Sequence, residues 1–112
     1  MPEPLSAEDV KIVTLARSTR ARSSAAEGAA VRDTDGRTYA AATVQLPSLR
    51  LSALQVAVAM AASSGVTGLE AAAVVTAAST VDSAGLAAVR DLGASTPAIL
   101  AGPDGVVREI LR

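Results

Sequence analysis

The sequence provides almost no aromatic side chains for a core. Of its 112 residues, 26 are alanine, and Tyr39 is the only aromatic residue. A core of Ala, Val and Leu buries less apolar area per residue than one with Phe or Trp, and buried apolar area stabilises by roughly 25 cal/mol per Å². The chain therefore gains less stability from its own core, and we expect association with another chain to add to it.

Composition predicts a single folded domain, residues 1–112, and excludes several classes of function. Leu, Ile and Val total 27 residues, which places the chain outside the composition of disordered proteins. The absence of Cys and His excludes disulfides, thiol enzymes, His-based triads and thiolate zinc sites. Ten basic residues against eleven acidic ones give a net charge of −1, without the basic excess that nucleic acid binding requires.

No export or membrane segment is expected. The first residues, Met1–Pro4, lack the basic and apolar blocks of a signal peptide. The uncharged stretch Leu51–Leu69 is rich in Ala and contains Ser, Gln and Gly, unlike a membrane-spanning helix. We therefore expect a cytoplasmic protein without membrane contact, and nine Arg against one Lys indicates a GC-rich bacterial genome.

Local signals predict three helices, each opened by a Ser or Asp cap. Ser52 with Gln55 three residues later forms a capping box, and Gly65 is placed for a left-handed helix cap. The predicted helices are Ala7–Arg22, Ser52–Ser64 and a third that begins at Asp82 or Ser83 and ends at Leu92.

Apolar runs and turn signals predict five strands. These are Glu27–Arg32, Arg37–Val44, Leu69–Thr76, Pro97–Ala101 and Val106–Leu111. The first two flank Asp-Thr-Asp-Gly, a strong hairpin signal, and Pro47 then breaks the chain. The third is apolar without alternation, as in a strand covered on both faces. A hairpin followed by crossover helices predicts a three-layer α/β/α domain around a mixed five-stranded sheet.

This order, together with two local segments, resembles the small, homotetrameric nucleoside cytidine deaminase family from Leu15 to Leu111. Residues 28–39 read Gly-Ala-Ala-Val…Asp-Gly-Arg-Thr-Tyr, similar to the family's Val-Gly-Ala-Ala-Leu…Asp-Gly-Arg-Val-Phe. Residues 97–105 read Pro-Ala-Ile-Leu…Asp-Gly, similar to its Pro-Val-Ile-Leu…Asp-Gly. The resemblance implies a cytidine deaminase-like fold across nearly the whole chain.

The resemblance also implies a zinc site that this chain has lost. The family's second helix begins with Cys-Ala-Glu, in which the Cys binds zinc and the Glu carries protons. The best hydrophobic register sets Ser52 against that Cys and Leu54 against that Glu, whereas a shift by one residue gives Ala53 and Gln55. Neither register restores a zinc ligand or a proton carrier.

The third helix shows the same loss. The family's Pro-Cys-x-x-Cys segment supplies two further zinc ligands, and here Asp82 and Gly85 stand at those positions, or Ala84 and Ala87 in a second register. Because zinc binds tightly to about four N or S ligands, we expect no metal, no cofactor and no catalytic residue. Ser52 and Asp82 are then interpreted as plain helix caps.

The residues that the resemblance assigns to substrate binding are replaced as well. Ala25 stands near the family's stacking Phe, and Thr43-Val44-Gln45-Leu46 stands at its ribose-binding Asn-Val-Glu-Asn. Gln45 can hydrogen-bond a sugar, although an ordinary surface loop position is the favoured interpretation.

Other charged residues are given structural roles. The acids Asp33, Asp35 and Asp104 lie in turns, where Asp bonds the local backbone. A cluster of Arg17, Arg20 and Arg22 is interpreted as a solvated helix end, with an acidic partner or phosphate as the alternative.

The second helix predicts a homo-oligomer, a dimer or tetramer. At 100° per residue its core face comprises Leu51, Leu54, Val58 and Ala61. The opposite face comprises Ser52, Gln55, Val56, Ala59 and Ser63, flanked by Met60. It carries no charge, and the proposed interface residues on it are Val56, Ala59 and Met60. The alternative is that small and polar residues there simply face water.

Three functional hypotheses follow. The leading one is a zinc-free, catalytically inactive relative of cytidine deaminases that serves as a structural or protein-interaction module. The second is a nucleoside binder or deaminase with a rearranged pocket, which requires polar groups converging near Thr43, Gln45, Ser52 and Asp82. The third is an accessory domain that docks on an unidentified protein partner through its Ala-rich surface.

Overall fold

A computed structural model describes residues 5–112 of the chain, and the expectation about Met1–Pro4 lies outside these residues. The elements, in chain order, are α1 (Ala7–Ser23), β1 (Glu27–Asp33), β2 (Thr38–Ala42), β3 (Val44–Leu46), β4 (Leu49–Leu51), α2 (Ala53–Ser63), β5 (Leu69–Thr76), α3 (Ser83–Leu92), β6 (Ala98–Ala101) and β7 (Val107–Leu111).

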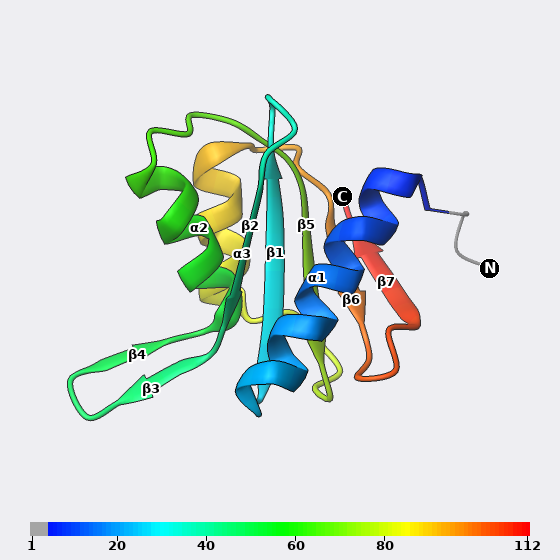
Figure 1. Cartoon of the computed structure of the whole chain (residues 1–112). Coiled ribbons are helices and arrows are strands. Elements are labelled where there is room, and N and C mark those ends of the chain that lie inside the picture. Colours follow the sequence, from blue (N-terminus) through cyan, green and yellow to red (C-terminus); the bar gives the residue numbers. More distant parts are fainter. Residues whose placement is uncertain (1–4) are drawn as a thin grey trace.

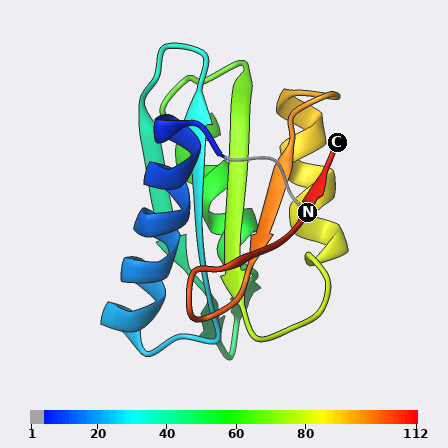
Figure 2. The same ribbon diagram turned by 90° about the vertical axis from the view of Figure 1, so that its right-hand side faces the viewer.

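The main sheet has five strands in the order β2-β1-β5-β6-β7. Strands β5 and β6 pair parallel and the other neighbours pair antiparallel, so the sheet is mixed. Helix α1 covers one face, whereas α2 and α3 cover the other (Figures 1 and 2). The predicted three-layer α/β/α fold is confirmed, with β5 at the centre of the sheet as expected.

Two core clusters fill the space on either side of the sheet. Alternate residues of β5 point to opposite faces, so that Val74 packs with α2 and α3 while Val75 packs with α1. The buried members of the two clusters together are Ala, Val, Leu and Ile, and Tyr39 lies only at the margin of one cluster. Small residues allow close approach: a Cβ on Gly28 would overlap the carbonyl oxygen of Ala16, because α1 rests directly on β1.

Helix boundaries follow the predicted caps. The Ser52 hydroxyl accepts a hydrogen bond from the Gln55 N–H, and the Gln55 side chain accepts one from the Ser52 N–H, which completes the capping box. Gly65 has φ +92°, the left-handed conformation expected after α2. Of the two candidate caps for α3, Asp82 is the N-cap and Ser83 is the first helical residue.

The Asp-Gly signal marks a real hairpin. Strands β1 and β2 are antiparallel, and Gly36 has φ +86° in the turn between them. The predicted strand Arg37–Val44 is wrong at its C-terminal end, because pairing with β1 stops at Ala42. From Val44 the chain turns away into a second, separate pair of strands.

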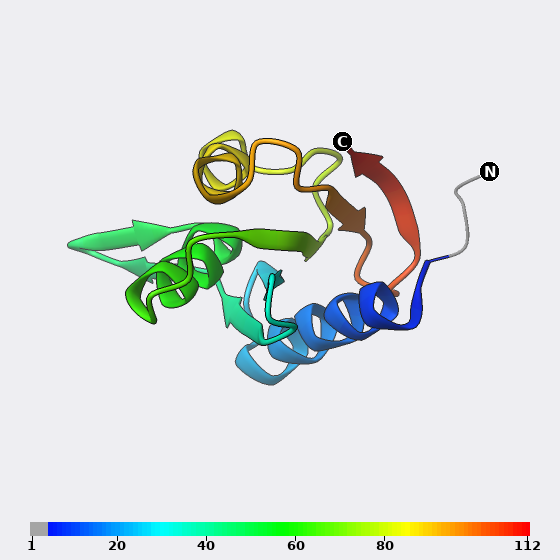
Figure 3. The ribbon, with the colours of Figure 1, turned by 90° about the horizontal axis from the view of Figure 1, so that it is seen from above.

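That second pair was not predicted. Strands β3 and β4 form a hairpin that projects from the domain (Figures 1 and 3). Its two-residue turn is Pro47-Ser48, and Leu46 pairs with Leu49 across it. The sequence predicts a chain break at Pro47, but a proline whose fixed φ suits the first central turn position leaves pairing on either side intact.

Most residues of α2 lie on the buried or exposed face of the helix that the sequence predicts for them. Leu54, Val58 and Ala61 are buried, and Ala59, Met60 and Ser63 are exposed, as expected. Three residues of the outer face are only half-buried instead of exposed: Ser52, Gln55 and Val56. Ser52 and Gln55 bond each other at the start of the helix, while Val56 packs at the edge of the core. Within residues 5–112, no helix is long and apolar enough to cross a membrane.

Candidate functional site

Helices α2 and α3 begin side by side, and this brings the predicted site positions together. A Cβ placed on Gly85 would lie 2.9 Å from the Leu54 Cβ, 3.1 Å from the Ser52 hydroxyl oxygen and 3.3 Å from an oxygen of Asp82. Four positions from two segments about thirty residues apart therefore meet at one corner of the fold.

The oxygen atoms at this corner already have partners. The Ser52 hydroxyl accepts from the Gln55 N–H at 3.1 Å, and the Asp82 carboxylate accepts from the Gly85 N–H at 2.7 Å. Each bond satisfies one of the N–H groups that a helix start leaves unpaired. Both residues are N-caps, as the sequence predicts.

The other two positions carry no polar side chain. Leu54 is 1% exposed and belongs to the core cluster between the sheet and the two helices. Gly85 is buried, and its lack of a side chain allows α3 to approach α2. The corner therefore presents one hydroxyl and one carboxylate, and no group able to carry protons stands at the Leu54 position.

This donor set does not fit zinc. A tightly held zinc ion takes about four ligands, mostly imidazole nitrogen or thiolate sulfur. In residues 5–112, no three Asp, Glu, His or Cys side chains are grouped so as to hold a metal ion. The residues at the start of α2 and α3 therefore offer too few ligands, and of the wrong type, for the zinc site that the resemblance implies.

An open hollow of about 370 Å³ lies beside this corner. It is lined by Glu27, Thr43, Val44, Gln45, Arg50, Leu51, Ser52, Gln55 and Asp82. Four residues singled out from the sequence, Thr43, Gln45, Ser52 and Asp82, thus share one hollow. Ala25 lies in the α1–β1 connection, outside this lining.

Thr43 is tied to the sheet. Its hydroxyl oxygen accepts from the Glu27 N–H at 3.1 Å and lies 3.4 Å from the Glu27 carbonyl oxygen, to which it donates. Gln45 is exposed on the projecting hairpin. The threonine therefore fixes the point where the chain leaves the main sheet, whereas the glutamine side chain is open to water.

Sequence reasoning missed the charged lining residues Glu27 and Arg50. Glu27 was interpreted only as the first residue of a strand, and nothing local distinguishes it from other strand ends. Arg50 reaches the hollow because β4 pairs back along β3. The signal for that pairing is the alternation of aliphatic residues on both sides of Pro47. A break in the chain at Pro47, as the sequence analysis predicts, hides this signal.

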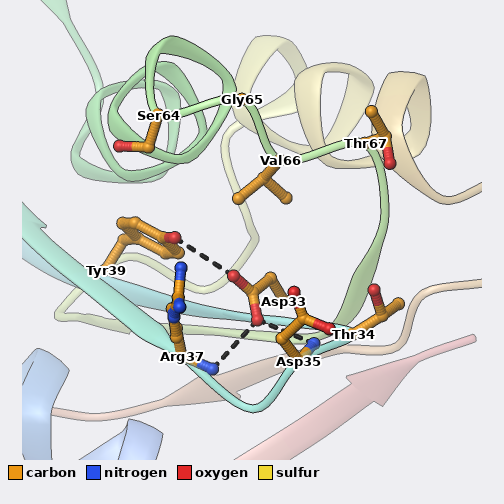
Figure 4. A pocket seen from close by; sticks show the side chains of 9 residues that line it. All are labelled: Asp33, Thr34, Asp35, Arg37, Tyr39, Ser64, Gly65, Val66 and Thr67. Carbon is orange, nitrogen blue, oxygen red and sulfur yellow. Dashed lines mark hydrogen bonds between the residues drawn. The ribbon is translucent and has the colours of Figure 1, made fainter.

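A second hollow of about 120 Å³ lies where β1 and β2 are joined, beside the end of α2 (Figure 4). Asp33, 3% exposed, accepts hydrogen bonds there from the Asp35 N–H, the Arg37 N–H and the Tyr39 hydroxyl. Burial alone would raise the pKa of Asp33, but these bonds, that from Arg37 first, hold it below its usual value. Burial and the bond to Asp33 raise the pKa of Tyr39.

These contacts give two of the three turn acids, Asp33 and Asp104, structural roles. Asp33 closes the β1–β2 turn, and Asp104 accepts from the Val106 N–H at 2.9 Å in the β6–β7 turn. The arginine cluster lies at the end of α1, where Arg17 and Arg22 are exposed. Arg20 donates to the Ala26 carbonyl oxygen and ties that end to the following turn.

Comparison with known proteins identifies the family of this chain. A family model described as cytidine deaminase-like matches residues 5–105. Among solved structures, a cytidine deaminase from Burkholderia pseudomallei is similar, with a TM-score of 0.80 and 22% sequence identity over 96% of this chain and 92% of that one. A search of curated proteins finds no match. At 22% identity the structural likeness shows the fold, and the family model covers most of the sequence. The chain belongs to the cytidine deaminase-like family.

Proposed function

We propose that this chain is a catalytically inactive, zinc-free member of its family that serves as a structural or protein-interaction module. The observation that carries the proposal is the chemistry at the start of α2 and α3. Ser52 and Asp82 supply the only side-chain oxygens among the four positions there, and both oxygens cap helices. Leu54 is buried and aliphatic.

Deamination of a cytosine ring needs an activated water and a group that moves protons. A capping hydroxyl is a poor base without a neighbouring imidazole or amine, and the sequence has no His and a single Lys. Lys11 is exposed on α1, which covers the opposite face of the sheet. The corner therefore has no proton carrier at the Leu54 position, its one carboxylate, on Asp82, caps α3, and it falls short of the ligand set that zinc needs.

A turnover assay tests the proposal. Purified protein at high micromolar concentration is incubated with cytidine and with deoxycytidine, and uridine products are measured with and without a chelator. We expect no product above the uncatalysed background. Product that scales with protein concentration and disappears with chelator would contradict the proposal.

A second candidate function is nucleoside binding in a rearranged pocket. It is favoured by the shared lining of the hollow, which combines Thr43, Gln45, Ser52 and Asp82 with Glu27 and Arg50. Recognition there would rest on polar contacts, since the lining includes no aromatic side chain on which a base could stack.

Ligand-induced stabilisation separates the two candidates. A nucleoside present at one hundred times its Kd stabilises a protein by about 2.7 kcal/mol, which a thermal-shift screen detects readily. The leading proposal expects no shift with millimolar cytidine, uridine or adenosine. A shift that is lost in Gln45→Ala but kept in Ser63→Ala, a matched change on the exposed end of α2, would favour the second candidate instead.

The proposed module associates with itself, as a dimer or tetramer, through the outer face of α2. Helix α2 contains no charged residue, and Ala59 and Met60 are exposed on it. A solvent-facing helix normally carries charged side chains, so an uncharged face of mostly small residues is better suited to contact with protein. Docking of an unidentified protein on the same face is the alternative.

A further inference from the structure

The hollow where β1 and β2 are joined has no part in the function proposed above. It lies at the end of α2, whereas the corner lies at the start of that helix, and the two hollows share no lining residue. Its volume of about 120 Å³ leaves room for several water molecules, or for one small molecule of about six non-hydrogen atoms. Figure 4 shows Asp33, Arg37 and Tyr39 on one side of it and residues 64–67 on the other.

Asp33 brings a negative charge to the wall of this hollow. Burial would raise its pKa, but the hydrogen bonds from the Arg37 N–H, the Tyr39 hydroxyl and the Asp35 N–H hold that pKa below the usual value. Within residues 5–112, Asp33 forms no ion pair, although buried charges are usually paired. A carboxylate has about four acceptor positions, and three are taken, so it can still accept a hydrogen bond from a cationic group.

Arg37 brings the opposite charge to the same hollow. Its side chain is exposed and forms no hydrogen bond or ion pair with the part of the chain that the structure describes. The guanidinium is close enough to Asp33 to lower the pKa of that carboxyl, but the two groups do not form an ion pair. A carboxylate and a guanidinium therefore border one small hollow without touching each other.

These charges select among classes of ligand. A simple anion would be attracted by Arg37 but repelled by Asp33 and by Asp35, which also lines the hollow. A simple cation would be attracted by Asp33 but repelled by Arg37. Residues 5–112 also contain no group of three acidic, His or Cys side chains arranged for a metal ion. A small molecule that carries both charges satisfies both groups.

We propose that this hollow binds a small zwitterion of the free α-amino acid class, such as glycine or alanine. The ammonium group of the ligand donates to the Asp33 carboxylate, and the carboxylate of the ligand accepts from the forked N–H groups of Arg37. Tyr39 and Ser64 can add acceptor oxygens, because their hydroxyls already donate to Asp33 and to the Met60 carbonyl oxygen. The end of α2, with its partial negative charge, also favours the ammonium group.

Size restricts the ligand to the smallest members of this class. Glycine and alanine have about five or six non-hydrogen atoms, which suits the volume of the hollow. A ligand this small that stays partly open to water binds weakly, and we expect a dissociation constant of about 1 mM.

Titration of the ¹⁵N-labelled wild-type protein with glycine, followed by NMR, tests the inference. We expect saturable shifts of the amide signals of Arg37 and of residues 64–67. Acetate and methylammonium, which correspond to the two halves of glycine, are titrated at matched ionic strength. Each should bind at least tenfold more weakly than glycine, because each satisfies one of the two charges and is repelled by the other.

A charge-removing variant tests the carboxylate contact. Arg37→Gln changes an exposed position and should weaken glycine binding at least tenfold without loss of folding. Arg22→Gln, the same change at an exposed position of α1, is the matched control and should leave the glycine titration unchanged. Asp33 is kept because its side chain also holds the β1–β2 turn. The acetate titration tests the ammonium contact on the wild-type protein instead.

Four results would overturn the inference. Acetate that binds as tightly as glycine would leave no role for Asp33, and methylammonium that binds as tightly would leave none for Arg37. No saturable shift up to about 50 mM glycine, or equal binding by the wild type and Arg37→Gln, would show that the hollow is not a zwitterion site. None of these results bears on the proposed lack of zinc and turnover, because the two hollows lie at opposite ends of α2.

Discussion

A Cβ atom on Gly85 would lie 2.9 Å from the Cβ atom of Leu54. The two residues belong to α3 and α2, and that spacing is below ordinary carbon–carbon contact, so only glycine fits at position 85 without a shift of one helix. The resemblance to cytidine deaminases assigns a zinc ligand to one of these positions and a proton carrier to the other. This chain uses the pair as a helix–helix packing contact.

Gly85→Ala should therefore destabilise the fold. Adding one methyl to a fully packed contact typically costs about 1–3 kcal/mol in the free energy of unfolding. Urea denaturation measures the change. Ala84→Ser, at an exposed neighbouring position of the same helix turn, is the control and should change stability by less than about 0.5 kcal/mol. Equal stability of Gly85→Ala and wild type would contradict the close packing.

Leu54→Glu should lower stability instead of restoring activity. Leu54 is 1% exposed among aliphatic side chains, and an unpaired carboxylate buried there costs at least about 3 kcal/mol. Leu54→Met keeps the volume and polarity and should cost under about 1.5 kcal/mol. Thermal melting compares the two variants. An unchanged melting midpoint for Leu54→Glu would argue that position 54 is open to water.

Ser52→Ala should cost about 1 kcal/mol by removing the hydroxyl that accepts the Gln55 N–H at the start of α2. Ser52→Asp keeps an N-cap acceptor and is expected to retain most of the stability. Chemical denaturation of both variants checks this. If Ser52→Ala is as stable as the wild type, the cap contributes nothing, and the hydroxyl would be free for another role.

Asp33 makes stability depend on pH. Because its pKa is lowered in the folded protein, its contribution is present above the unfolded value of about 3.9 and is lost as pH falls through the folded pKa. Asp33→Asn should therefore destabilise at pH 7, with the difference from wild type shrinking below about pH 4. The control is Asp35→Asn, an exposed neighbour in the same turn. A difference that is constant from pH 7 to pH 3 would contradict the assignment.

Much of the fold is predictable because its signals are local. Ser52 with Gln55 is a complete capping box within four residues, and Gly36 and Gly65 stand where the backbone needs positive φ. The continuous apolar run of β5 identifies the central strand because both of its faces are covered. Each of these predictions depends only on a few residues that are neighbours in the sequence.

The β3–β4 hairpin escapes prediction because its signal lies in the pairing of two residues and not in either one alone. Pro47 has the same local preference in a chain break and in a two-residue turn, and only the pairing of Leu46 with Leu49 distinguishes the two. Only the family resemblance predicts that Ser52 and Asp82 lie close together, because no local pattern in either segment indicates contact with the other. Glu27 and Arg50 join them through tertiary contacts that no local pattern encodes.

Zinc content tests the central claim most directly. The protein is expressed in zinc-supplemented medium, dialysed against metal-free buffer and analysed by elemental mass spectrometry beside a blank of the same dialysis buffer. Ser52, Leu54, Asp82 and Gly85 together offer one hydroxyl and one carboxylate, both engaged as helix caps, so we expect well under about 0.1 zinc per chain. About one zinc per chain, retained through dialysis and lost in the Asp82→Ala variant, would contradict the account.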